Sequence, residues 1–291
     1  MAKYRGMTIN PKRFYKDQIK FYAILIPMAI FVALPMIFIL SHAFKPTNEL
    51  FAYPPRFFVR VPTFNNFRNL VQVASTSGIP FSRYLFNSII VTVVGVFLSI
   101  LVTSMAAYAL SKLKFKGKKW LFEINTLALM FVPIAVTIPR YLTISALGLI
   151  DSYSVLILPL IAIPVGLFLV KQFIDQTPNE LIESAKIDGA SEMEIFLKII
   201  MPIIAPAVAT VGILSFQLIW NDVVGSSLFI NNESMRTLSF YFSTLASLTG
   251  NPVAGQGMLA AATLIMFVPN IVIFIFLQAK VMNTMAHSGI K

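Results

Sequence analysis

The chain of 291 residues contains no cysteine and only two histidines. Without cysteine, neither a disulfide framework nor a metal site built from thiolates is available. His42 and His287 are far apart in the sequence, and each is more typical of an interfacial side chain than of a metal ligand. These absences exclude the common structural metal sites.

Motifs of the common hydrolytic enzymes are also absent. The sequence has no Walker A phosphate-binding loop, no His-Glu-x-x-His zinc motif and no nucleophile elbow. We therefore expect a chain that is not an enzyme and does not hydrolyse ATP by itself.

Charged residues are scarce, at 12% of the chain, whereas 57% of the residues are hydrophobic and the mean hydropathy is +0.79. This composition lies outside the soluble globular range. The apolar residues form stretches of about 20, each long enough to cross about 30 Å of hydrocarbon as a helix. We predict an all-α, polytopic membrane protein with six transmembrane helices, at approximately Phe21–Leu40, Tyr84–Leu110, Trp120–Pro139, Tyr153–Val170, Ile203–Trp220 and Gly257–Ala279.

No ionisable residue lies near the centre of these stretches. Glu123 and Arg140 fall at the ends of the third stretch, and Arg83 lies at the start of the second. A charge at the centre of a span costs about 2.5–3.5 kcal/mol and is usually retained for ion or proton coupling. Its absence disfavours a proton-driven carrier.

Basic residues outnumber acidic ones by 23 to 12, which gives a net charge of +11. If the N-terminus is cytoplasmic, six crossings place sixteen of the 23 basic residues on the cytoplasmic side, as the positive-inside rule requires. We therefore predict cytoplasmic N- and C-termini, a basic tail over residues 1–20 and a transmembrane domain over 21–291. The charge is explained by topology and anionic lipid rather than by nucleic acid.

A basic tail before an apolar stretch is also the pattern of a signal peptide, and Ser41-His42-Ala43 faintly resembles a cleavage site. The apolar core of a signal peptide is typically about 7 to 15 residues long, shorter than this stretch. A retained first span is the better interpretation.

The stretches contain prolines and neutral polar residues. Prolines are compatible with broken helices along a translocation path and equally with ordinary kinked packing. Small polar residues either line such a path or bond neighbouring helices. The candidates are Asn87, Ser88, Thr92, Tyr108, Asn125, Thr126 and Gln217.

A polar interruption over residues 171–202 separates the fourth and fifth stretches. Thr177-Pro178-Asn179-Glu180 has the pattern of a capping box, so we expect a helix from Pro178. Gly189 is expected to end that helix in the left-handed conformation, and Ser191-Glu192-Met193-Glu194 offers a second capping box. An apolar stripe on the second helix comprises Ile195, Phe196, Ile199 and Ile200. The pattern predicts two short helices joined by a tight cytoplasmic turn.

The run from Glu183 to Ala190, followed by Phe196, Ile199 and Met201-Pro202, resembles the Glu-Ala-Ala loop of membrane subunits of binding-protein-dependent ABC importers. Other landmarks resemble the carbohydrate-importer branch of that family, which includes the smaller membrane subunit of the maltose system. They are Phe44-Lys45-Pro46, Asn87-Ser88, Ala107-Tyr108-Ala109, Lys114-Phe115-Lys116-Gly117 and Trp220-Asn221-Asp222.

The resemblance implies a permease of the type I ABC importer fold in a bacterial cytoplasmic membrane. Its expected partners are a second homologous permease subunit, a dimer of cytoplasmic ATPase subunits, an extracytoplasmic substrate-binding protein, membrane lipid and a sugar, expected to be an oligosaccharide. ATP and Mg²⁺ would be bound by the ATPase, and this chain would carry no cofactor and bind no nucleic acid.

The resemblance also assigns roles within the loop. Glu183 would pair with a basic group of the ATPase, and Gly189 would permit the sharp turn. The expected coupling residues are Glu183, Ser184, Ala185, Asp188, Gly189 and Ala190. The chain departs from the family pattern at Ser184, at Met201 and in its tail, which weakens the expectation that the tail enters the ATPase.

Three alternatives stay open. The solute could be something other than a sugar, and a secondary transporter is a more distant alternative, because the sequence shows no internal repeat and no intramembrane charge. The outward segment from Ser226 to Gly255 is either an adaptable contact for the binding protein or a plain connecting loop.

Overall fold

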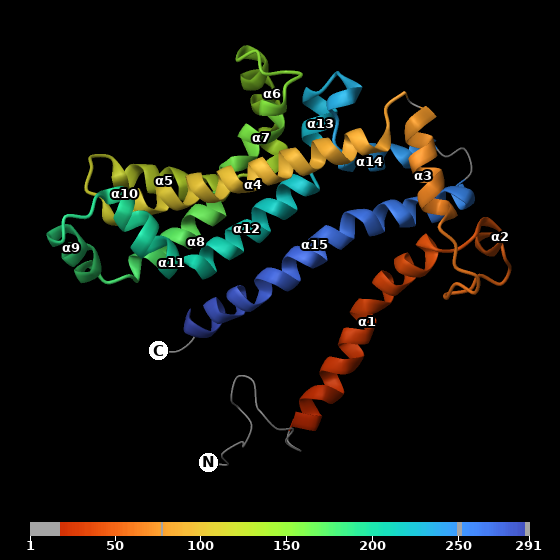
Figure 1. Ribbon diagram of the computed structural model, residues 1–291, viewed down its shortest axis with the longest axis horizontal. Helices are drawn as coiled ribbons and strands as arrows, with labels where there is room; N and C mark the ends of the chain where they lie inside the picture. The colour runs from red at the N-terminus through yellow and green to blue at the C-terminus, as the bar shows by residue number, and fades with distance from the viewer. Residues whose placement is uncertain (1–17, 77, 249–251, 289–291) are drawn as a thin grey trace. The chain divides into compact units, whose positions relative to one another are not determined.

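The computed structural model describes residues 18–76, 78–248 and 252–288. Within these ranges the chain forms helices and loops and no strand, which confirms the prediction of an all-α fold (Figure 1). By contacts between residues the chain separates into two compact units, Met1–Leu70 with Thr249–Leu264, and Val71–Leu248 with Ile265–Lys291.

Three continuous helices are long and apolar enough to cross a membrane. They are α1 (Ile19–Ala43), α4 (Phe81–Lys112) and the Gly255–Gln278 part of α15 (Pro252–Ser288). Their apolar surfaces are largely exposed in the isolated chain, as expected for helices that face lipid or another subunit.

The three remaining predicted spans are bent pairs of helices. The pairs are α5 (Lys118–Ala128) with Pro133–Ala146 (η2 and α6) at 110°, α7 (Tyr153–Ile161) with α8 (Pro164–Asp175) at 45°, and Glu192–Ile203 with α12 (Ala205–Trp220) at 83°. Counting each bent pair as one span gives the predicted six, with the fifth predicted stretch in α12 and Glu192–Ile203 in the polar interruption before it.

Proline explains two of these breaks. Val132 and Ile163 precede Pro133 and Pro164 and have extended backbone angles, because the ring of a proline disfavours a helical conformation in the residue before it. The third predicted stretch, over Trp120–Pro139, is therefore a broken helix, one of the two forms that its prolines allowed. Other prolines lie inside continuous helices, namely Pro27 and Pro35 in α1, Pro159 in α7 and Pro269 in α15.

In the first unit, hydrogen bonds between side chains and the backbone hold the segment that follows α1. The Glu49 carboxylate in α2 (Thr47–Leu50) accepts the backbone N–H groups of Arg60 at 3.1 Å and Val61 at 2.9 Å, and these bonds lower the pKa of Glu49. Asn66, near the start of α3 (Asn65–Thr76), donates to the Ala43 and Lys45 carbonyls at 2.9 and 2.8 Å. These bonds fix the loop together with ring contacts among Phe44, Phe64 and Phe67.

In the second unit, α4 is the central helix and packs against α7, α8 and α12 (Figure 1). One buried apolar cluster joins the C-terminal part of α4 to α8, α12 and the polar interruption. Another joins its N-terminal half to α6 (Thr137–Ala146), α7, α12 and residues 229–230. The short elements α13 (Val224–Phe229), η4 (Glu233–Met235) and α14 (Leu238–Leu248) complete this unit.

Candidate functional site

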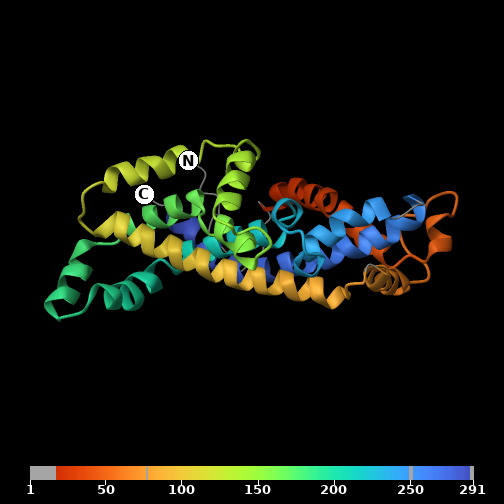
Figure 2. The same ribbon diagram turned by 90° about the horizontal axis from the view of Figure 1, so that it is seen from above.

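The polar interruption folds as a helical hairpin, defined here as residues 177–203. It comprises α9 (Asn179–Ile187), α10 (Glu192–Ile195), a π-helical turn over Phe196–Ile200 and α11 (Met201–Ile203). Both views place α9 and α10 at the end of the second unit where α4 ends and α5 begins (Figures 1 and 2). The predicted pair of short helices with a tight turn is confirmed.

Gly189 ends α9 as predicted, with φ at +83°. The Gly189 N–H donates to the Lys186 carbonyl at 3.1 Å, and the Ala190 N–H donates to the Ala185 carbonyl at 3.0 Å. This pair of bonds is a Schellman motif, which satisfies carbonyls at the end of a helix. A Cβ added at Gly189 would meet nothing within 4 Å, so the backbone angle and not space within this chain requires glycine here.

The second capping box is also confirmed. Ser191 Oγ accepts the Glu194 N–H at 3.3 Å, while the Glu194 carboxylate accepts the Ser191 N–H at 3.1 Å. The bond from the Ser191 backbone, and then that from Lys198, lowers the pKa of Glu194 to about 2. Because the carboxylate stays charged at physiological pH, the start of α10 is capped under all such conditions.

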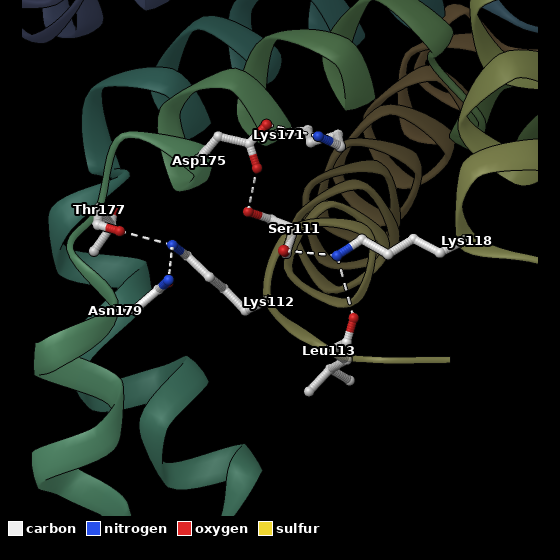
Figure 3. A network of polar contacts seen from close by, with 8 residues as sticks. All are labelled: Ser111, Lys112, Leu113, Lys118, Lys171, Asp175, Thr177 and Asn179. Atoms are coloured by element: carbon white, nitrogen blue, oxygen red, sulfur yellow. Dashed lines mark hydrogen bonds and ion pairs between the residues drawn. The ribbon is translucent and has the colours of Figure 1, made fainter. Parts of the chain in front are cut away.

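The first capping box is wrong. Helix α9 begins at Asn179, one residue later than predicted, and no side chain caps its N-terminus. The buried Thr177 Oγ1 has no hydrogen-bond partner among the described atoms. Lys112 of α4 holds this segment without capping the helix, because its Nζ donates to the Thr177 carbonyl at 2.7 Å and to Asn179 Oδ1 at 2.8 Å (Figure 3), whereas an N-cap accepts backbone N–H groups.

Tyr108 provides a second anchor for the hairpin, one helical turn before Lys112 on α4. Its hydroxyl donates to Glu192 Oε2 at 2.7 Å, and its ring lies 5.6 Å from that of Phe196. The other oxygen of Glu192 pairs with Lys186 at 2.5 Å. One carboxylate therefore ties α10 to both α4 and α9.

The base of the hairpin is held by a further polar network. Ser111 Oγ donates to Asp175 Oδ1 at 2.5 Å, and Lys171 Nζ contacts Asp175 Oδ2 at 2.6 Å (Figure 3). The network joins the end of α4 to the end of α8, from which the hairpin starts.

Apolar packing reinforces these contacts. One face of the hairpin is buried in the cluster that also contains Val170 of α8 and Ala207 of α12. The buried hairpin residues are Ile182, Ala185, Ile195, Phe196 and Ile200. Complete burial of such side chains stabilises a structure by about 1.5–3 kcal/mol each. The hairpin is therefore continuous with the core and moves with α4, α8 and α12.

The opposite face of the hairpin is exposed and contains most of the predicted coupling residues. Glu183, Ser184, Asp188 and Gly189 are exposed, whereas Ala185 is buried and Ala190 is half-buried. Glu183 has no hydrogen-bond or ion-pair partner among the described residues. Ile187, which is 86% exposed, lies beside this group.

Among the residues predicted to line a translocation path, Asn87, Ser88 and Thr92 lie buried in the N-terminal half of α4. Asn87 Nδ2 donates to the carbonyls of Ser234 and Arg236 at 2.9 and 2.8 Å, and Ser88 Oγ accepts the Leu238 N–H at 2.7 Å. In this structure they hold the segment that follows α12.

The other candidates lie elsewhere. Tyr108 is about 30 Å from Ser88 along the axis of α4. Asn125 donates to the Pro164 carbonyl at 3.2 Å, and Thr126 bonds to its own helix. Gln217 is exposed on α12. The candidates do not form one cluster, and their contact with a solute stays a prediction.

The segment from Ser226 towards Gly255, as far as it is described, is helical and held at several points rather than a plain loop. The Asp151 carboxylate accepts the N–H groups of Asn231 and Asn232 at 3.0 and 2.8 Å, in addition to the bonds from Asn87 and Ser88. Residues 249–251 lie outside the described ranges. Its contact with a binding protein stays a prediction.

Three polar residues of the hairpin anchor were not predicted from the sequence, namely Lys112, Lys186 and Glu192. One signal was available, since Tyr108 and Lys112 are four residues apart at the end of a predicted helix and so share a face. Their partners are 65 to 84 positions away, and no local pattern reveals such contacts.

Comparison with known proteins agrees with this architecture. Residues 95–280 match the family described as the inner membrane component of binding-protein-dependent transport systems. A protein named as an ABC transporter permease, ORF2 of Caldicellulosiruptor sp. (strain Rt8B.4), is 32% identical over 96% of this chain and 99% of its own length.

Two further relatives carry more specific names. The arabinooligosaccharides transport permease AraQ of Halalkalibacterium halodurans is 28% identical over 91% of this chain and 93% of its own length. The trehalose transport permease SugB of Mycobacterium tuberculosis is 29% identical over 93% and 97%.

The fold is similar to that of a chain in the crystal structure of a bacterial ABC transporter that imports alginate. The TM-score is 0.78 at 22% identity, over 93% of this chain and 99% of that one. Together with the family match, the bent spans and the anchored hairpin, this similarity identifies the type I permease fold. The chain belongs to the family of inner membrane components of binding-protein-dependent transport systems, and is a non-catalytic, multi-pass permease subunit of an ABC importer in the bacterial cytoplasmic membrane.

Proposed function

We propose that this chain forms, with a second permease subunit, the translocation path for an oligosaccharide delivered by an extracytoplasmic binding protein. The sugar class is supported by relatives that are named for arabinooligosaccharide and trehalose transport. The import direction is supported by the family description.

The hairpin would couple this path to a separate cytoplasmic ATPase that binds ATP and Mg²⁺. The supporting observation is that its buried face is bonded and packed onto α4, α8 and α12, while the exposed carboxylates of Glu183 and Asp188 have no partner among the described residues. A unit capped and anchored in this way transmits a displacement as a rigid body.

The exposed face has the chemistry for docking. Glu183 and Asp188 supply negative charge, and the apolar Ile187 and the half-exposed Met193 lie beside them. Glu183 would pair with a basic group of the ATPase, and the apolar side chains would be buried at the contact.

In a path shared by two subunits, the lining residues are exposed in each isolated chain. Gln217 meets this condition, whereas Asn87, Ser88 and Thr92 do not. We therefore assign Gln217 to the path, and assign Asn87 and Ser88 to holding the outward segment in place.

The proposal is tested by mild solubilisation of the tagged chain from its native membrane, followed by identification of the proteins that copurify. We expect a homologous permease and an ATPase with a Walker A motif. Recovery of the intact chain without any ATPase would contradict the proposal. The solute is then tested by measuring which oligosaccharides stimulate ATP hydrolysis when the binding protein is added.

A further inference from the structure

A basic cavity lies at the junction of α4, α5 and α8, outside the hairpin. Its volume is about 460 Å³, within the range of sites that hold small ligands. Its lining includes three lysines, which are Lys118, Lys119 and Lys171. It also includes three apolar side chains, those of Leu110, Phe115 and Phe122. The cavity therefore combines positive charge with an apolar wall.

The positive charge of the cavity is only partly neutralised within the chain. Lys118 Nζ donates to two neutral carbonyls, those of Ser111 at 2.8 Å and Leu113 at 3.2 Å, and pairs with no carboxylate within the described ranges. Lys119 is exposed and lies 3.8 Å from Glu123, a distance at which an ion pair at the surface contributes little.

The third lysine is more tightly held. Lys171 pairs with Asp175 at 2.6 Å and lies 4.6 Å from the centre of the Phe122 ring. The segment from residue 112 to 119 adds Lys112, Lys114 and Lys116 to the local charge and contains no acidic residue. The cavity therefore has a net positive charge that the described residues do not balance.

The position of the cavity indicates what could balance this charge. It lies where α4 ends and α5 begins, on the side that the positive-inside rule predicts to be cytoplasmic. Next to it, α5 exposes Trp120, Leu121 and Ile124. An exposed tryptophan beside lysines is typical of the level of the lipid headgroups.

We infer that this cavity binds the anionic headgroup of a phospholipid from the cytoplasmic leaflet. Lys118 and Lys119 contact the phosphate, and the acyl chains follow the apolar wall at Phe122. Lys118 bonds to the carbonyls of Ser111 and Leu113, the residues on either side of Lys112. Lys112 in turn anchors the hairpin. The bound headgroup therefore also stabilises the end of α4 from which the hairpin is held. This inference does not depend on the transported solute.

The test uses the tagged chain with its copurifying partners, reconstituted in phosphatidylcholine nanodiscs that contain phosphatidylglycerol. Native mass spectrometry measures the phosphatidylglycerol retained after release from the nanodisc. One lysine near a membrane surface changes the affinity for anionic lipid about fivefold, so Lys118→Gln/Lys119→Gln is expected to weaken retention about 25-fold. Lys20→Gln/Lys198→Gln removes the same charge outside the cavity and is expected to leave retention unchanged.

Lys119→Gln alone provides a second test, because this exposed side chain is not needed for folding, and a loss of about fivefold is expected. Equal losses in the cavity and control variants would overturn the inference in favour of unspecific charge attraction. If inorganic phosphate displaced the lipid, the inference that the bound phosphate group belongs to a phospholipid would be overturned. If the cavity variants retained phosphatidylglycerol normally but lost a copurifying protein, the inference would be overturned. That result would show that a protein partner covers the cavity.

Discussion

At the scale of single residues, substitutions at Gly189 distinguish two requirements. One is the left-handed backbone angle at this position, and the other is the space that a docked partner needs. Its φ of +83° costs about 1–2 kcal/mol for any residue with a Cβ, but no described atom lies within 4 Å of a Cβ placed there. Gly189→Ala and Gly189→Arg therefore have the same backbone strain, and only arginine would obstruct a docked protein. A comparison of the two variants therefore separates an effect on docking from an effect on folding.

We expect Gly189→Arg to insert normally and to abolish uptake, while Gly189→Ala retains most of it. The measurement is solute uptake per transporter complex in cells, with membrane insertion checked for both variants. Equal uptake by the two variants would place the docking surface elsewhere on the chain.

Tyr108 tests the anchor between α4 and α10. Tyr108→Phe removes the hydroxyl bond to Glu192 and keeps the ring packed near Phe196. Because Glu192 is half-exposed, the loss is about 1 kcal/mol, or roughly a fivefold faster hydrogen exchange at the start of α10. Tyr141→Phe is the matched control, since the Tyr141 hydroxyl has no bond within the described residues. If hydrogen exchange were equally slow in both variants, the claim that the Tyr108 hydroxyl anchors α10 would be contradicted.

At the scale of elements, the hairpin is built on two short helices, and only four residues lie between the end of α9 at Ile187 and the start of α10 at Glu192. Its caps were visible in the sequence at Gly189 and at Ser191 to Glu194, because capping depends on neighbours along the chain. The start of α9 was not visible, because no side chain caps it and the segment is held instead by Lys112 of another helix. Local chemistry therefore predicted one of the two helix starts.

Ser191→Ala is expected to weaken α10 by about 1 kcal/mol, because it removes the side-chain acceptor of the capping box. Hydrogen exchange over residues 192–200 measures the effect, with a roughly fivefold increase expected in the exchange rate. Ser184→Ala, in the exposed face of α9, is the matched control and is expected to be neutral or slightly stabilising. A similar response of the two variants would mean that the box does not stabilise α10.

At the scale of the whole molecule, the remaining question is whether the sharply bent pair of α5 and α6 acts as one crossing. The chain contains no cysteine, so any introduced cysteine is its only thiol. Tyr53 is 95% exposed, Lys114 is exposed between α4 and α5, and Leu147 is exposed after α6.

A membrane-impermeant maleimide applied to intact cells is expected to label Tyr53→Cys and Leu147→Cys but not Lys114→Cys. Lys114→Cys should react in inverted vesicles, which shows that its thiol is accessible. Labelling of Leu147→Cys only in inverted vesicles would mean that this bent pair enters and leaves on the same side of the membrane.

The sequence by itself determined the membrane class, the number of apolar stretches, the capped turn at Gly189 and the family. Each of these depends on composition, on spacing or on neighbours within a few residues. The tertiary structure decided where Pro133 and Pro164 break a span and by what angle, and that Tyr108 and Lys112 hold the hairpin. It also brought Lys118, Lys119 and Lys171 around one cavity. The reason is that helix packing creates contacts between residues far apart in the chain, and no local pattern encodes them.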